Sequence, residues 1–407
     1  MSELSIRRAF PRLGLAAALV SSIACGGGGE DSVDPCSNES GTACTWAGVK
    51  GQRGFNADGL NRNESWLMFV SDLTFGPDGL AYLVDWNNHR IRRVEADDTL
   101  QTIIGTDYEG DGPPGEIDRL PEGDPQGAPG TDIALNHPTD IEFMADGSLL
   151  MAAWHNNKLR VMDMDTGIVK VLAGNSYGFA GDDSPAWGAL MNQPKAVVVD
   201  EEGLIYTIDQ RNERIRVIDP SGERMIRTIA GTGEVGYTGD GGPALEAQFH
   251  FDVKPTPDPS GSLALRDGIL YIADTLNHCI RTLDLETGMV ESIAGTGEAG
   301  YSGDGGDAIE AQLNQPLDIE FGPEGHLYIA DRFNNVIRAM DLDSGVIETV
   351  AGNGQHCDGS ALDCYNEEEN VAPLDVQLSE PYGIAFDPAG DLYIADTNNS
   401  RIVKVTR

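Results

Sequence analysis

The chain has 407 residues, 40% of them hydrophobic, so it is long enough to bury a large core. Its formal net charge is −39, from 66 acidic and 27 basic residues spread over the whole length. This charge disfavours unspecific binding to nucleic acid or to anionic lipid headgroups, and we expect no nucleic-acid partner.

The N-terminus has the features of an export signal. Arginines precede a short apolar run, LGLAAALVSSIA, that ends at Cys25. This run is too short to span a bilayer, so residues 1–24 are interpreted as a signal peptide. The segment SSIAC resembles a bacterial lipobox, although Ser22 stands where leucine is usual, and it predicts lipidation of Cys25. We expect a lipoprotein of the outer membrane or cell surface that touches the membrane only through its lipid. A periplasmic or secreted protein is the alternative.

A flexible tether is predicted next. Residues 25–42 are rich in glycine, acidic and polar residues, and they precede a domain that spans residues 43–407. Two local pairs of cysteines can form disulfides in an exported protein, and other connectivities stay open. The pairs are Cys36 with Cys44, and Cys357 with Cys364.

One pattern then recurs six times, beginning with DGLAYLVDWNNHRIRRV at Asp78 and ending with AGDLYIADTNNSRIVKV at Ala389. Each copy holds a D-x-x-N turn, in which the asparagine is present six times and the aspartate five times, because Ala153 replaces it in the second copy. These side chains can hydrogen-bond a turn backbone and tolerate left-handed geometry, so we assign them a structural role in turns. They are Asp85, Asn88, Asn156, Asp209, Asn212, Asp274, Asn277, Asp331, Asn334, Asp396 and Asn399.

Each copy is expected to form four strands, as in the segments NQPLDIEFGPEG, LYIAD, VIRAMDL and GVIETVAG. Repeated units of this kind cannot bury both faces alone, so they predict a β-propeller. The copies resemble the NHL repeat family, named for an asparagine–histidine–leucine signature, and Asn88-His89 and Asn277-His278 keep the histidine. The resemblance covers nearly all of the chain after the tether. It implies an all-β, six-bladed propeller and says little about a ligand.

The two ends of the repeat region are expected to meet. The last copy ends at Arg407 in its third strand, while CTWAGVKGQRGFNADG from Cys44 matches the fourth-strand pattern SIAGTGEAGYSGDGG. We therefore predict that residues 43–48 complete the blade of residues 379–407. Such pairing closes the ring and removes two sheet edges.

Glycine motifs between the copies imitate ligand loops. G-x-G-x-x-G occurs at Gly231–Gly236 and again at Gly295–Gly300, at one repeat position and without a following helix. A dinucleotide loop is needed once and opens a helix, so these glycines are instead predicted to allow tight chain reversals between blades. The Asp-Gly loops that follow lack the ligand spacing of an EF-hand and are also interpreted as turns.

One set of acidic residues recurs at the start of the predicted inner strands: Asp72, Asp140 and Asp318, with Asp252 as a fourth candidate. The two remaining blades have Ala196 and Gly383 there. First strands line the central channel of a propeller, so these carboxylates are candidates for a channel mouth. Two interpretations stay open. They bind calcium or a cationic group of a partner, or each caps a strand through backbone hydrogen bonds.

The seven histidines fall at unlike repeat positions, so we expect no convergence on a metal, although metal content stays open. No motif of nucleophilic or acid–base catalysis is present, and no cofactor is expected apart from the calcium considered above. The expected function is that of a non-catalytic, monomeric propeller that binds a protein, peptide or saccharide. The alternative is a propeller lyase or hydrolase with a metal in its channel.

Overall fold

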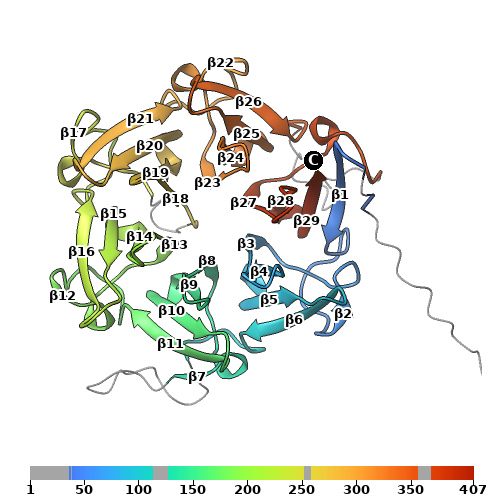
Figure 1. Ribbon diagram of the computed structural model, residues 1–407, viewed down its shortest axis with the longest axis horizontal. Helices are drawn as coiled ribbons and strands as arrows, with labels where there is room; N and C mark the ends of the chain where they lie inside the picture. The colour runs from blue at the N-terminus through green and yellow to red at the C-terminus, as the bar shows by residue number, and fades with distance from the viewer. Residues whose placement is uncertain (1–35, 38, 113–126, 252–257, 356–367) are drawn as a thin grey trace, which may run out of the picture. The chain divides into compact units, whose positions relative to one another are not determined.

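The computed structural model describes residues 36–37, 39–112, 127–251, 258–355 and 368–407. Within these ranges, six antiparallel sheets follow one another around a ring (Figure 1). The innermost strand of each sheet contacts the innermost strand of the next. The last of them, β27 (Pro381–Phe386), contacts the first, β3 (Val70–Phe75), so the ring is closed. The prediction of a six-bladed all-β propeller is confirmed.

The strands fall into blades in chain order. Blade 1 contains β2 (Leu60–Asn61), β3 (Val70–Phe75), β4 (Ala81–Asp85), β5 (Arg90–Val94) and β6 (Thr99–Ile104). Blade 2 contains β7 (Ala128–Pro129), β8 (Pro138–Phe143), β9 (Leu149–Ala153), β10 (Lys158–Asp163) and β11 (Ile168–Ala173). Blade 3 contains β12 (Ser184–Pro185), β13 (Pro194–Val199), β14 (Ile205–Asp209), β15 (Arg214–Ile218) and β16 (Met225–Ala230).

The second half of the ring repeats this arrangement. Blade 4 contains β17 (Gly242–Pro243), β18 (Ser262–Arg266), β19 (Ile269–Asp274), β20 (Cys279–Asp284) and β21 (Met289–Ala294). Blade 5 contains β22 (Gly306–Asp307), β23 (Pro316–Phe321), β24 (Leu327–Asp331), β25 (Val336–Met340) and β26 (Val346–Ala351). Blade 6 contains β27 (Pro381–Phe386), β28 (Leu392–Asp396), β29 (Arg401–Thr406) and β1 (Thr42–Ala47).

Short 3-10 helices occupy two kinds of position, and no described helix is long and apolar enough to cross a membrane. Six lie in the D-x-x-N turns: η1 (Trp86–Asn88), η3 (Trp154–Asn156), η5 (Gln210–Asn212), η7 (Thr275–Asn277), η9 (Arg332–Asn334) and η11 (Thr397–Asn399). Five lie in the connections between blades: η2 (Gly130–Asp132), η4 (Ala186–Gly188), η6 (Ala244–Glu246), η8 (Ala308–Glu310) and η10 (Pro373–Asp375).

Blades 1 to 5 have one strand more than predicted. The order in blade 5 is β22-β26-β25-β24-β23, so the two-residue β22 pairs with the outer strand of the blade that follows it in the chain. These added strands come from the Gly- and Pro-rich connections, and their length leaves no hydrophobic alternation to recognise in the sequence.

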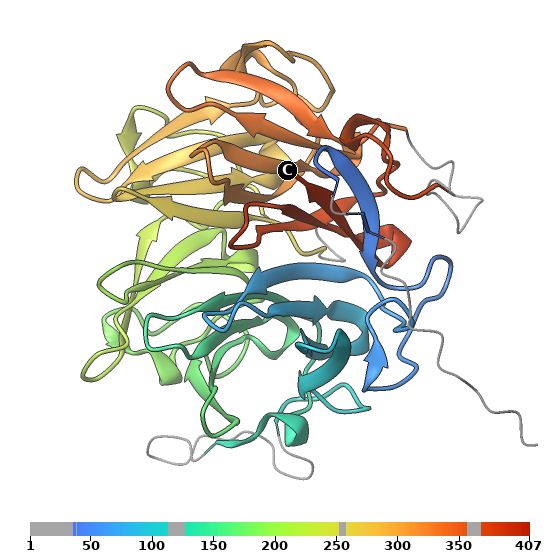
Figure 2. The same ribbon diagram turned by 45° about the vertical axis from the view of Figure 1, so that its right-hand side comes forward.

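The predicted closure of the ring is confirmed. β1 pairs antiparallel with β29, with Thr42 opposite Thr406 and Thr45 opposite Val403. Figure 2 shows β1 in blue beside the dark red C-terminal strands. Because β1 is the outer strand of blade 6, residues from both ends of the chain complete one sheet.

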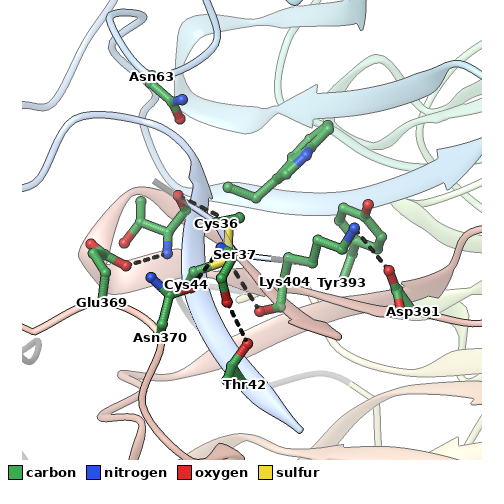
Figure 3. The surroundings of a disulfide bond; sticks show 12 residues. Cys36, Ser37, Thr42, Cys44, Asn63, Glu369, Asn370, Asp391, Tyr393 and Lys404 are labelled. Atoms are coloured by element: carbon green, nitrogen blue, oxygen red, sulfur yellow. Dashed lines mark hydrogen bonds and ion pairs between the residues drawn. A yellow bond between two sulfur atoms is a disulfide. The ribbon is translucent and has the colours of Figure 1, made fainter. Parts of the chain in front are cut away.

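A disulfide between Cys36 and Cys44 anchors the residues before β1. Glu369 and Asn370 lie on one side of it and Lys404 lies on the other (Figure 3). The backbone N–H of Thr45 donates a hydrogen bond of 2.6 Å to Glu369, which ties β1 to the connection before blade 6. Four residues considered above lie outside the described ranges: Cys25, Asp252, Cys357 and Cys364.

The D-x-x-N turns connect consecutive parts of the repeat. In blade 5, Oδ1 of Asp331 accepts a hydrogen bond of 2.7 Å from the backbone N–H of Asn314, and Asn334 donates one of 2.7 Å to the carbonyl of Gly300. Arg338 is fully buried and pairs with both Asp331 and Asp304, the aspartate of the preceding Asp-Gly loop. Arg92, Arg216 and Arg281 form equivalent pairs in blades 1, 3 and 4.

The first glycine of each G-x-G-x-x-G motif packs against the backbone at the end of a D-x-x-N turn. Gly295 has φ +90°, and a Cβ at this position would lie 2.3 Å from the backbone oxygen of His278. Gly231, at the equivalent position, would meet the backbone oxygen of Glu213 at the same distance. Only glycine fits such a close approach at positive φ. The glycines of this motif therefore allow a tight turn of the chain between blades, as predicted.

The position of the signature histidine carries a bond between blades. Nδ1 of His278 accepts a hydrogen bond of 3.1 Å from the backbone N–H of Gln315 in the next blade, and His89 accepts one from His137 in the same way. Side-chain oxygens take this role in the other copies, at Asn157, Glu213, Asn335 and Ser400. The repeat requires a hydrogen-bond acceptor here, which is why Asn, Glu and Ser replace histidine without loss of the fold.

Candidate functional site

The inner strands line a cavity of about 400 Å³ at the centre of the ring. Five carboxyl groups belong to its wall, in two tiers. The first tier is Asp72, Asp140 and Asp318. The second tier is Glu142 and Glu320, which follow two residues later on β8 and β23, because residues i and i+2 of a strand share one face.

The first-tier carboxylates bond the backbone of the neighbouring blade. Each accepts a hydrogen bond through Oδ2 from an N–H of the next inner strand in the ring. The pairs are Asp72 with Ile141 (2.9 Å), Asp140 with Val197 (3.0 Å) and Asp318 with Ile384 (2.8 Å). These bonds join blade to blade, and they are the type of contact that the capping interpretation requires.

One buried cation accompanies the first tier. The Lys195 side chain is only 3% exposed, and it forms no hydrogen bond or ion pair of its own with the residues in the described ranges. Burial raises the pKa of Asp72 well above its ordinary value, and Asp140 and Asp318 raise it further. Burial also raises the pKa of Asp140, to about 6. The ammonium of Lys195 opposes the rise in all three aspartates, so it lies within their common field.

Among the residues that the structure describes, no cation comparable to Lys195 accompanies the second tier. Glu142 and Glu320 come from blades 2 and 5, on opposite sides of the ring, and neither forms an ion pair with a described residue. Burial, and then Asp140, raises the pKa of Glu142 to about 8. Burial, and then Glu142, raises the pKa of Glu320 well above its ordinary value. By exposed surface, Glu142 is half-buried and Glu320 is exposed, so both carboxyl groups can be reached by solvent in the cavity.

Neither tier forms a ready metal site. In the part of the chain that the structure describes, no three His, Cys, Asp or Glu side chains are arranged to hold a metal ion. The calcium interpretation of Asp72, Asp140 and Asp318 therefore has no ligand geometry to support it there. What the channel offers is a set of carboxyls whose raised pKa values would fall if a positive group entered.

Three histidines lie close together, and none of them lines the cavity. The ring centroids of His89 and His137 lie 4.4 Å apart, and those of His137 and His155 lie 4.8 Å apart. His137 precedes the inner strand of blade 2 and His155 lies in that blade's turn, while the interblade bond from His137 brings His89 beside them. Residues at different positions of the repeat thus come together, because the turn of blade 1 packs against the segment that precedes the inner strand of blade 2.

Two tryptophans pack against this cluster. The ring of Trp154 stacks on that of His155 with their centroids 4.1 Å apart, and the ring centroids of Trp86 and His137 lie 4.6 Å apart. Burial lowers the pKa of all three histidines, in His137 to about 4. Nδ1 of His89 accepts the interblade hydrogen bond, while Nδ1 of His137 and Nδ1 of His155 face each other at 3.0 Å.

Comparison with known proteins finds similarity to NHL-repeat proteins. Residues 378–405 match the family model "NHL repeat". The chain is 31% identical to human NHL repeat-containing protein 2 over 49% of this chain and 29% of that protein. It is 29% identical to Protein SUPPRESSOR OF QUENCHING 1, chloroplastic, from Arabidopsis thaliana, over 65% of this chain and 24% of that protein. The chain thus spans less than a third of the length of these relatives.

Solved structures with the same fold include two from Bacteroides thetaiotaomicron. One is a structural genomics protein of unknown function, with a TM-score of 0.62 and 16% identity over 89% of this chain and 75% of that chain. The other is an auxiliary nutrient binding protein, with a TM-score of 0.60, 15% identity and the same coverage. At these identities the likeness concerns the fold.

Proposed function

We propose that this chain, a six-bladed β-propeller of the NHL-repeat type, is a non-catalytic binding protein that takes the ammonium group of a small ligand into its channel. The observation that carries the proposal is the second tier, where Glu142 and Glu320 line the cavity without a cation among the described residues. Two carboxyls that face one cavity, Glu142 half-buried and Glu320 exposed, attract a positively charged guest more strongly than either would alone in bulk water.

The first tier supplies the precedent within the same channel. Lys195 provides one ammonium near three aspartates, and it lowers the pKa of each. A ligand ammonium between Glu142 and Glu320 would act on the second tier as Lys195 acts on the first. Three phenylalanines also line the cavity and offer ring faces or edges to the ligand: Phe75, Phe321 and Phe386.

A role in ligand capture outside the cytoplasm fits the remaining features. The signal-like N-terminus and Cys25 support export and lipid tethering. The disulfide between Cys36 and Cys44 supports an oxidising compartment. The Bacteroides protein of similar fold is described as a nutrient binding protein, which agrees with a propeller that holds a small guest. Labelling with radioactive palmitate tests the tether. The parent chain should be labelled and Cys25→Ser should not, whereas label in both would refute lipidation at Cys25.

Calorimetric titration of the purified full chain with 1,4-diaminobutane tests the channel. Binding should release protons, because a bound ammonium lowers the pKa of Glu142 and Glu320, so the heat should depend on the ionisation enthalpy of the buffer. For the same reason, affinity should rise as the pH increases from 6 to 8. The double variant Glu142→Gln/Glu320→Gln should lose at least tenfold in affinity.

Two controls separate charge from shape and from general surface effects. The neutral analogue 1,4-butanediol should not bind, and Glu348→Gln, at an exposed glutamate of β26, should bind the diamine as the parent does. Absence of diamine binding by the parent, or equal affinity of parent and double variant, would contradict the proposal.

A further inference from the structure

We propose that Nδ1 of His137, Nδ1 of His155 and Oδ1 of Asn136 form one face of a binding site for a divalent transition metal ion, beside η1 and η3 and separate from the channel. The nitrogens lie 3.0 Å apart, and the amide oxygen lies 2.7 Å from His137 Nδ1 and 3.2 Å from His155 Nδ1. Ligand atoms bound at about 2.1 Å and at right angles around one ion lie roughly 3.0 Å apart. The triangle has the size of such a coordination face.

One tautomer of His137 suits a metal ligand. With its hydrogen on Nε2, the ring donates to Oδ1 of Asn87 at 3.1 Å, and Nδ1 presents a lone pair. In that tautomer Nδ1 and Oδ1 of Asn136 are two acceptors 2.7 Å apart, and a cation beside both would bind them together. Asn87 thereby acts as the outer partner that fixes a metal-binding tautomer.

The other two ligands are held in position by their own contacts. The His155 ring stacks on Trp154, whose indole N–H donates a hydrogen bond of 2.7 Å to Gln210. The backbone carbonyl of Asn136 accepts a hydrogen bond of 3.2 Å from the N–H of His155. The ligand-bearing residues are thus fixed relative to each other before any ion arrives, which is the condition for a preorganised site.

Blade 2 departs from the repeat at this place. Ala153 replaces the turn aspartate, and Oδ1 of Asn156 accepts the backbone N–H of Asn136 in its stead. The fold uses the backbone N–H of His137 for the bond between blades, and the imidazoles of His137 and His155 take no part in that bond. The corresponding trios in blades 3 and 5 contain no histidine: Asn192, Gln193 and Arg211, and Asn314, Gln315 and Phe333. The metal-ligand residue types therefore coincide where the repeat itself does not require them.

Solvent reaches the site. Asn136, His137 and His155 are all half-buried, so a bound ion would keep open positions for water or a ligand, as in binding or catalytic sites rather than closed structural ones. Imidazole nitrogens favour zinc, copper, nickel or iron over calcium or magnesium. The third donor is an amide oxygen, so the site differs from the sets of three His, Cys, Asp or Glu side chains that are absent from the described residues.

The test uses the purified full chain, prepared without a polyhistidine tag and titrated with Co²⁺ and with Zn²⁺. The parent should bind one equivalent of either ion at pH 7, with a shift of the cobalt absorption bands and a rise in melting temperature. His155→Phe keeps the stacking on Trp154 but removes the nitrogen, and it should lose at least tenfold in affinity. His326→Ala, at a half-buried histidine of the opposite half of the ring, should bind as the parent does.

Asn136→Asp supplies a gain-of-function arm. A carboxylate oxygen in place of the amide should raise the affinity for Zn²⁺ about tenfold, a result that a purely structural asparagine would not give. This variant also keeps the proposal falsifiable if His155→Phe does not fold. Failure of the parent to bind Co²⁺ or Zn²⁺, unchanged affinity in His155→Phe, or no gain in Asn136→Asp would each overturn the proposal.

Discussion

Replacing Glu142 with glutamine tests the electrostatics of the channel independently of any ligand. Burial and the neighbouring Asp140 raise the pKa of Glu142 to about 8, whereas the unfolded chain should show the ordinary value of 4.5. Between these two values the folded state keeps a proton that the unfolded state releases. The contribution of this group to folding stability therefore falls as the pH rises from about 4.5 to about 8, and it stays low above that.

The magnitude follows from the width of this window. Each pH unit is worth at most about 1.4 kcal/mol for one proton, so a window of roughly 3.5 units sets an upper bound of about 5 kcal/mol. Glu142 is only half-buried, and channel water screens it, so we expect a smaller effect of about 1 to 2 kcal/mol. Glutamine has the shape of the protonated acid and never ionises. The variant should match the parent at pH 5 and be about 1 to 2 kcal/mol more stable at pH 8.5.

Urea denaturation followed by tryptophan fluorescence measures this difference at pH 5, 7 and 8.5. Glu348→Gln, at an exposed position of β26, is the matched control and should show no growth of the difference with pH. A parent-to-variant difference for Glu142→Gln that is equal at pH 5 and pH 8.5 would refute the reasoning, because it would mean that Glu142 ionises as an ordinary surface glutamate does.

Three further predictions concern the fold. Replacing both Cys36 and Cys44 with alanine should lower the free energy of unfolding by about 2 to 3 kcal/mol, seen as a lower urea midpoint, because the disulfide closes a short loop of the unfolded chain; an unchanged midpoint would contradict this. Gly295→Ala should lower the free energy of unfolding by more than about 1 kcal/mol, because its methyl group would lie 2.3 Å from a backbone oxygen. Gly188→Ala is the control, since a methyl group there meets no atom within 4 Å. Equal melting temperatures of the two variants would refute the close approach. Arg338→Met should lower the free energy of unfolding in urea by about 3 to 5 kcal/mol, because Asp331 and Asp304 lose their ion-pair partner. A loss below about 1 kcal/mol would show that these ion pairs contribute little to stability.

The architecture could be predicted from the sequence because six recognisable copies of the repeat indicate six blades. The N-terminal match at Cys44 also predicted the strand exchange at the ring closure, which the pairing of β1 with β29 confirms. The short outer strands such as β22 were missed because two residues of glycine and aspartate carry no strand signal. These short strands form because they pair with the outer strand of a blade, and that strand lies far from them in the sequence.

The site was predictable only in part. The recurring acids Asp72, Asp140 and Asp318 indicated the channel, but Glu142 and Glu320 were overlooked although they lie two residues further along the same strands. Strand alternation was the available signal. Lys195 was missed because it is a single residue at one repeat position, and its relevance depends on packing from several blades.

The proximity of the histidines could not be predicted from the sequence. His137 and His155 occupy different positions of the repeat, so alignment of the copies separates them, while folding brings their Nδ1 atoms to 3.0 Å. One clue was present. Ala153 breaks the D-x-x-N motif in the same turn, and such a departure marks a place where a copy is free to serve something other than the fold.

The disulfide beside β1 has a mechanical consequence for a tethered protein. A pulling force applied before Cys36 bypasses residues 37–43 and reaches the chain at Cys44, which lies inside β1 opposite Lys404. The load therefore cannot peel β1 from its free end at Thr42. It acts on the middle of a strand that Arg401 and Glu369 hold through Thr45. A propeller attached through its N-terminus would thus carry the strain of its anchor in the blade where both ends of the chain meet, and the two tiers of the channel would be spared it.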